Sequence, residues 1–141
     1  MRTLRLMLAG IALLFICAAG NAIAKPATGK LTRDEVVKIY VDAATSGNVS
    51  KLNNVFADDL QFYIQRGDYV KTLDKNQLID YLKNDAASDP SVKTTTTVIL
   101  QDDNSSVIKV EFKYASYSRT DEVTLYKATG WLITKVVCQF M

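Results

Sequence analysis

Hydrophobic residues recur at helical spacing in the first segment beyond residue 30. One face of this segment carries Val36, Val37, Tyr40, Val41 and Ala44. Spacings of three and four residues predict an amphipathic helix. Thr32 and Glu35 form a capping box before it, and Gly47 is typical of the residue that ends a helix. We therefore expect the first helix to lie between Thr32 and Gly47.

The next segment predicts a short helix, a β-hairpin and a third helix. Apolar residues within 50–56 indicate the short helix, and strict alternation of apolar and polar residues over 60–65 predicts a half-buried strand. Glycine and aspartate at 67–68 turn the chain into a second short strand. Asp74 and Gln77 repeat the capping box, so a third helix is expected to begin there.

The remainder of the chain predicts four β-strands. They span 92–101, 106–118, 120–127 and 131–140, with a tight corner at Arg119. Their connections are short, so consecutive strands are expected to pair antiparallel. The sequence thus predicts an α+β domain of order α-α-β-β-α-β-β-β-β, in which three helices pack on one face of a curved antiparallel sheet.

Alternation along 106–118 identifies the interior face of this sheet. The apolar side carries Ile108, Val110, Phe112, Tyr114 and Ser116, and charged residues alternate with them on the other side. Polarity rises along this set toward residue 118. We therefore expect a packed end that grades into an open mouth lined by aromatic residues.

The last strand is apolar on both of its faces. One face is read as Trp131, Ile133 and Val137, and the other as Leu132, Val136, Cys138 and Phe140. A central strand covered on both sides has this pattern. Because the helices cover only one face of the sheet, we expect a second copy of the chain to cover the other in a homodimer.

The start of the chain has the three parts of a removable secretory signal. Arg2 and Arg5 are a positive head, residues 6–19 are an apolar run, and Ala22-Ile23-Ala24 supply small residues at a cleavage site. The run is shorter than the about 20 residues of a spanning helix, so no stable membrane anchor is expected after cleavage. We predict a signal peptide over 1–24, a flexible leader over 25–30 and one domain over 31–141, exported to the periplasm or the cell exterior.

Cleavage of this signal changes the composition and removes whole classes of function. It takes two arginines and no acidic residue, which leaves 15 of the 17 basic side chains against 15 acidic ones. A neutral chain without a basic cluster does not favour nucleic acid binding. The chain has no histidine, which excludes imidazole bases and most zinc sites, and we expect neither a metal nor a cofactor. Cys138 remains as the one cysteine, and its apolar neighbours indicate a small buried residue.

Three segments carry a resemblance to a known family. They are Tyr40 to Gly47, Phe56-Ala57-Asp58-Asp59-Leu60, and Gly130-Trp131-Leu132-Ile133-Thr134. Together with the order of elements, they resemble the nuclear transport factor 2-like superfamily, and within it small exported bacterial proteins labelled “putative lumazine-binding”. The resemblance covers nearly all of residues 31–140. It implies a cone-shaped half barrel whose helices and sheet enclose a pocket, often in a dimer through the outer face of the sheet.

The steroid isomerases of this superfamily use three groups, which the resemblance places on this chain one by one. A tyrosine on the first helix and an acid on a late strand hydrogen-bond an oxyanion, and they match Tyr40 and Asp121. The carboxylate base of the first strand falls on Ile64, which cannot accept a proton. The resemblance therefore implies a pocket with two polar anchors and puts isomerase activity in doubt.

These features lead to three hypotheses. The favoured one is an exported, non-catalytic domain that binds a small apolar or aromatic molecule through Tyr40, Phe62, Phe112, Tyr114 and Asp121. The second is an acid–base enzyme of isomerase or dehydratase type, using the same polar groups with a base that the sequence does not identify. The third is a structural or interaction module that dimerises through its sheet. An open cavity of several hundred Å³ that reaches Tyr40 would favour the first two over the third.

Overall fold

The computed structural model describes residues 30–85 and 91–141. The expected signal peptide, and the leader as far as residue 29, lie outside the described residues. Within the described part, the elements follow in the order α1 (Arg33–Ser46), η1 (Leu52–Asn54), β1 (Phe56–Arg66), β2 (Tyr69–Leu73), α2 (Lys75–Asp85), β3 (Lys93–Gln101), β4 (Ser105–Lys113), β5 (Ser118–Lys127) and β6 (Trp131–Phe140). This order confirms the predicted α+β class, with η1 a single 3-10 turn. None of the described helices is long and apolar enough to span a membrane.

Both α-helices begin at the capping boxes that the sequence predicts. The Thr32 hydroxyl accepts the backbone N–H of Glu35, whose carboxylate accepts the N–H of Thr32 at 2.7 Å. Asp74 and Gln77 exchange the same two hydrogen bonds at 2.9 and 3.0 Å. Gly47 ends α1 in the left-handed conformation, with φ of 74°. Local hydrogen bonding therefore fixes where each helix starts, whatever it later packs against.

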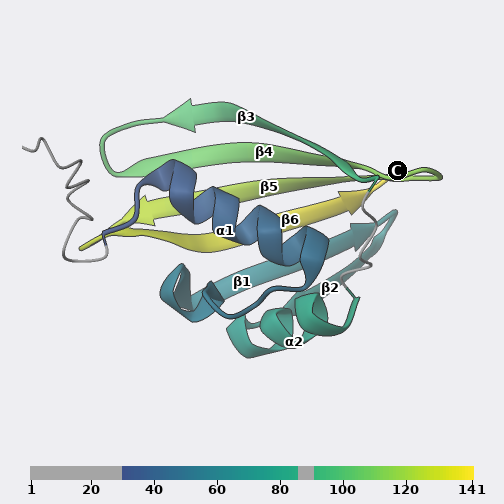
Figure 1. Ribbon diagram of the computed structural model, residues 1–141, viewed down its shortest axis with the longest axis horizontal. Helices are drawn as coiled ribbons and strands as arrows, with labels where there is room; N and C mark the ends of the chain where they lie inside the picture. The colour runs from purple at the N-terminus through teal and green to yellow at the C-terminus, as the bar shows by residue number, and fades with distance from the viewer. Residues whose placement is uncertain (1–29, 86–90) are drawn as a thin grey trace, which may run out of the picture.

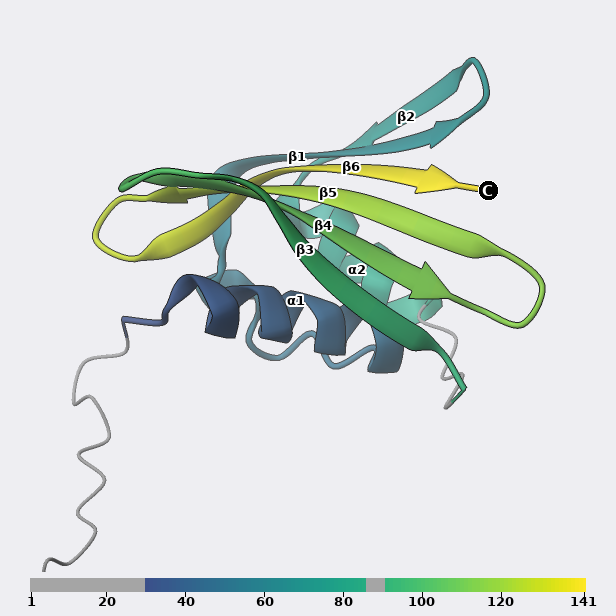
Figure 2. The ribbon, with the colours of Figure 1, turned by 90° about the horizontal axis from the view of Figure 1, so that it is seen from above.

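The strands form one curved sheet in the order β2-β1-β6-β5-β4-β3 (Figure 1). Figure 2 shows that α1 and α2 lie on the same side of the sheet, which curves around α1. The core between these layers is built on Tyr40, Phe56, Phe62, Phe112 and Leu78, all almost completely buried. One expectation is corrected, because β1 and β6 pair in parallel and the sheet is mixed. The long stretch of chain between these two strands allows the crossover that a parallel pair requires.

The connection between β4 and β5 lies earlier than the sequence indicates. The turn is made by residues 114–117, where the backbone N–H of Tyr114 donates to the carbonyl of Tyr117 at 3.0 Å. The expected corner at Arg119 is wrong, because Arg119 lies inside β5 and is 5% exposed. Tyrosines have high strand propensity, and this made the turn look like a continuous strand.

Strand β6 contains a β-bulge that changes which residues share a face. Thr124 lies opposite Lys135 but its neighbour Leu125 lies opposite Ile133, so Thr134 is an extra residue. Ile133 is therefore buried on the same face as Val136 and Cys138, contrary to the predicted division. The outer face of β6 is correspondingly more polar than expected. The homodimer inferred from an apolar outer face stays a prediction.

Candidate functional site

Tyr40 and Asp121, the two polar residues expected to lie together, are in direct contact. Tyr40 comes from α1 and Asp121 from β5, and neither side chain has any exposed surface. The Tyr40 hydroxyl donates to Asp121 Oδ2 at 2.5 Å. The structure thus brings these two residues together, and their role in ligand binding stays a prediction.

Arg119 completes this buried cluster, and sequence reasoning did not find it. Its guanidinium donates to both Asp121 oxygens, from Nε at 2.8 Å and from Nη2 at 2.5 Å, and Nη2 also donates to the Tyr40 hydroxyl at 3.1 Å. The same group lies over the ring of Phe112, 5.1 Å from its centroid. Residues two apart in a strand point to one face, so a strand assignment that began at residue 118 would have shown Arg119 beside Asp121.

The charged and polar groups of this cluster are paired with one another. Burial raises the pKa of Tyr40, and the neighbouring Asp121 carboxylate raises it further, so the hydroxyl keeps its proton. Burial opposes the charged form of Arg119, but Asp121 and Tyr40 outweigh it and hold the Arg119 pKa well above its usual range. No described buried side-chain nitrogen or oxygen lacks a hydrogen-bond partner. The proton that Tyr40 could offer to an oxyanion is therefore already donated to Asp121.

The position of the isomerase base is also unsuited to proton transfer. Ile64 lies in β1 with its side chain in the core, 8% exposed. A hydrocarbon there provides neither a base nor a hydrogen-bond acceptor. The Arg119, Asp121 and Tyr40 cluster thus joins α1 to β5 as a paired and desolvated unit.

An open cavity lies at the end of the sheet where β6 finishes. It has a volume of about 730 Å³ and is lined by Arg66, Gly67, Tyr81, Tyr117, Phe140 and Met141. These residues come from the β1–β2 turn, from α2, from the β4–β5 turn and from the end of the chain. We call this space the mouth cavity. Its volume lies within the range of small-molecule sites.

Flat aromatic rings surround the mouth cavity. Tyr114 and Tyr117 stack with centroids 4.4 Å apart and an interplanar angle of 14°. Phe140 lies 6.2 Å from Tyr117, and the guanidinium of Arg66 is 4.6 Å above the Phe140 ring. Tyr117 remains 42% exposed. The mouth therefore presents an uncovered aromatic surface with a positive charge at its rim.

The mouth cavity does not reach Tyr40, so it is not the cavity that the sequence-based hypotheses required, and the predicted ligand residues lie elsewhere. Tyr40, Phe62, Phe112 and Asp121 have no exposed surface, so a molecule in the mouth cavity cannot touch them without displacing core side chains. Tyr114 is half-buried behind Tyr117 at the rim. None of the residues that line the mouth cavity is in the predicted set: Arg66, Gly67, Tyr81, Tyr117, Phe140 and Met141. They lie in four separate segments, and only the tyrosine-rich 114–117 gave a signal in the sequence.

Comparison with protein families gives one match. The model of a family described as “Putative lumazine-binding” matches residues 32–137, nearly the whole described part of the chain. No protein with a curated description matches.

Solved structures share the fold at low sequence identity. A nuclear transport factor 2-like protein of unknown function from Methylobacillus flagellatus KT is 22% identical, with a TM-score of 0.62 over 79% of this chain and 96% of its own. Another, from Silicibacter pomeroyi DSS-3, is 19% identical, with a TM-score of 0.64 over 75% of this chain and 90% of its own. A “putative ketosteroid isomerase” from Parabacteroides distasonis ATCC 8503 is 12% identical, with a TM-score of 0.56 over 77% and 86%. Identities this low show the fold alone.

Proposed function

Because the chain belongs to the family described as “Putative lumazine-binding”, within the nuclear transport factor 2-like superfamily, we propose that it binds a small planar aromatic molecule in the mouth cavity. The observation that carries this proposal is the stacked Tyr114–Tyr117 pair, which holds an exposed ring against the cavity. Offset stacking is the preferred contact between flat rings. A pre-stacked tyrosine loses little freedom when a further ring is added to it.

The rim of the mouth cavity supplies the polar part of recognition. Arg66 is exposed and packs its guanidinium on the Phe140 ring. An arginine held flat on an aromatic ring keeps N–H groups free at its edge, and these suit a carbonyl or an anionic group of a ligand. A heteroaromatic molecule with ring carbonyls would then stack on Tyr117 and accept hydrogen bonds from Arg66.

We also propose that binding involves no catalysis and takes place after export. The paired state of Tyr40 and Asp121, and the hydrocarbon at Ile64, support a domain without acid–base chemistry. The three-part pattern of residues 1–24 supports export to the periplasm or beyond.

A fluorescence titration with lumazine tests the binding site. Lumazine is a planar, fluorescent bicycle, and stacking on Tyr117 should change its emission as the protein is added. A base stacked on an aromatic side chain contributes about 1–3 kcal/mol, so Tyr117→Ala should weaken binding at least about fivefold. Tyr126→Ala is the matched control, because Tyr126 is 54% exposed in β5, away from the residues of the mouth. Equal affinities of the two variants would contradict the proposed site.

A further inference from the structure

Strand β3 is an open edge of the sheet with unusual exposure. Among the strands of the described residues it pairs only with β4, and all nine of its residues are exposed. Val98, Ile99 and Leu100 keep 45%, 54% and 56% of their surface exposed. No charged residue or proline lies between Lys93 and Gln101. An edge of this composition is a template for a further strand, since its outward N–H and C=O groups have no partner in the sheet.

The other edge of the sheet is protected in the usual way. Strand β2 has five residues, and Lys71 lies at its centre. Short edge strands and central lysines prevent pairing with another chain. The β3 edge is therefore open to the addition of a further strand, whereas the β2 edge is protected against it.

A groove beside β3 extends the inner surface of the sheet. It measures about 330 Å³ and lies between Val37 and Val41 of α1 and Thr94, Thr96 and Val98 of β3, with Ile108 and charged α1 residues completing its lining. The inward-facing positions of β3 thus border open space instead of a packed neighbour. A strand added to the edge would place its own inward side chains over this groove.

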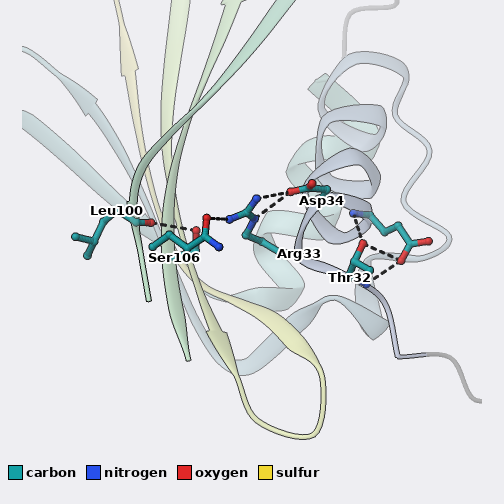
Figure 3. Close-up of polar contacts among 7 residues, drawn as sticks. Thr32, Arg33, Asp34, Leu100 and Ser106 are labelled. Atoms are coloured by element: carbon teal, nitrogen blue, oxygen red, sulfur yellow. Dashed lines mark hydrogen bonds and ion pairs between the residues drawn. The ribbon is translucent and has the colours of Figure 1, made fainter. Parts of the chain in front are cut away.

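Polar contacts hold β3 in position at its end (Figure 3). Arg33 of α1 donates to the Gln101 side chain, and the Ser106 hydroxyl donates to the Leu100 carbonyl at 3.1 Å. The ladder with β4 shifts between Val98 and Leu100. The ladder is regular from Lys93 to Val98. The uncharged part of this regular edge is Thr94–Val98, and its central residue is Thr96.

We propose that β3 pairs antiparallel with β3 of a second copy of this chain, with the two-fold axis at Thr96. In this register Thr94 lies opposite Val98 of the second copy, Thr95 opposite Thr97, and no lysine faces a lysine. Both copies use the same patch, and the inward Thr94, Thr96 and Val98 of each cover the groove of the other. Because the β2 edges are protected, assembly stops at two copies rather than forming a filament. This dimer differs from one through the outer face of the sheet and does not rest on the proposed ligand.

Disulfide trapping tests the register. Opposed residues of an antiparallel pair have Cα atoms about 4.5–5.5 Å apart, within the about 4.4–6.8 Å that a disulfide needs. Thr96→Cys, in a Cys17→Ser background, should give a covalent dimer under mild oxidation, since the remaining Cys138 is fully buried. Val70→Cys is the matched control on exposed β2. Equal cross-linking of the two variants, or none at Thr96, would overturn the proposal.

Light scattering tests whether the β3 edge is the dimer interface. The wild-type chain should have twice the chain mass at micromolar concentration, and Thr95→Lys/Thr97→Lys should reduce it to one chain mass with an unchanged circular dichroism spectrum. Val107→Lys, on the outer face of the adjacent β4, should leave the dimer intact, because this face remains free when the edges pair. A monomeric wild type overturns the proposal, as does a dimer that only Val107→Lys separates.

Discussion

Replacing Asp121 with asparagine is expected to remove a large part of the folding free energy. The carboxylate is fully buried and accepts two hydrogen bonds from Arg119 and one from Tyr40. Asparagine has nearly the same size, but it leaves the Arg119 charge without a counter-ion at 5% exposure. Removing one partner of a buried ion pair costs about 3–5 kcal/mol, against a total stability of about 5–15 kcal/mol for a domain.

Urea denaturation followed by circular dichroism measures this loss. With a slope of about 1.5 kcal/mol per molar urea, the midpoint of Asp121→Asn should fall by about 2–3 M. Arg119→Met/Asp121→Leu removes both charges together and should cost less than the single substitution. A loss below about 1 kcal/mol for Asp121→Asn, or a double variant as unstable as the single one, would refute the role given to the ion pair.

Three further measurements address the fold and its processing. Burial and Asp121 raise the pKa of Tyr40 above its usual 10.0 in the folded chain, so the unfolded chain loses this proton at a lower pH. The free energy of unfolding should therefore fall above about pH 10, by at most about 1.4 kcal/mol per pH unit. An equally steep fall in Tyr40→Phe would exclude Tyr40 as its source. Thr32→Ala removes the cap of α1 and should cost about 1 kcal/mol in urea denaturation, whereas Thr129→Ala, at an exposed turn, should cost little. Mass spectrometry of the protein recovered from a bacterial periplasm should find Lys25 at the amino terminus, and a retained Met1 would contradict export by cleavage.

The parts of the fold that depend on neighbouring residues could be predicted from the sequence. The capping pairs at Thr32 and Asp74 act across three residues, and Gly47 acts alone. The alternation of Leu60, Phe62 and Ile64 likewise follows from strand geometry alone. Side-chain periods of this kind do not depend on the rest of the chain.

The parts that depend on distant residues could not be predicted in this way. The bulge at Thr134 reflects a register shift between β5 and β6, and it reversed the expected face of Ile133. Arg119 looked like a corner residue because the predicted strand began at residue 120. Its counter-ion Asp121 is two positions away, and only its tyrosine partner is distant, on α1. The mouth residues are assembled from four segments, so no spacing in the sequence marks them as one site.

The most direct measurement of the binding claim is the set of backbone amide shifts in nitrogen-15 NMR spectra as lumazine is added to the protein. If the mouth cavity is the site, the largest shifts should fall on Gly67, Tyr117 and Phe140, with Tyr126 unchanged. Shifts centred on Val41 and Val98 would instead place the ligand in the groove between α1 and β3, and the absence of any shift at millimolar lumazine would contradict binding of this class of molecule.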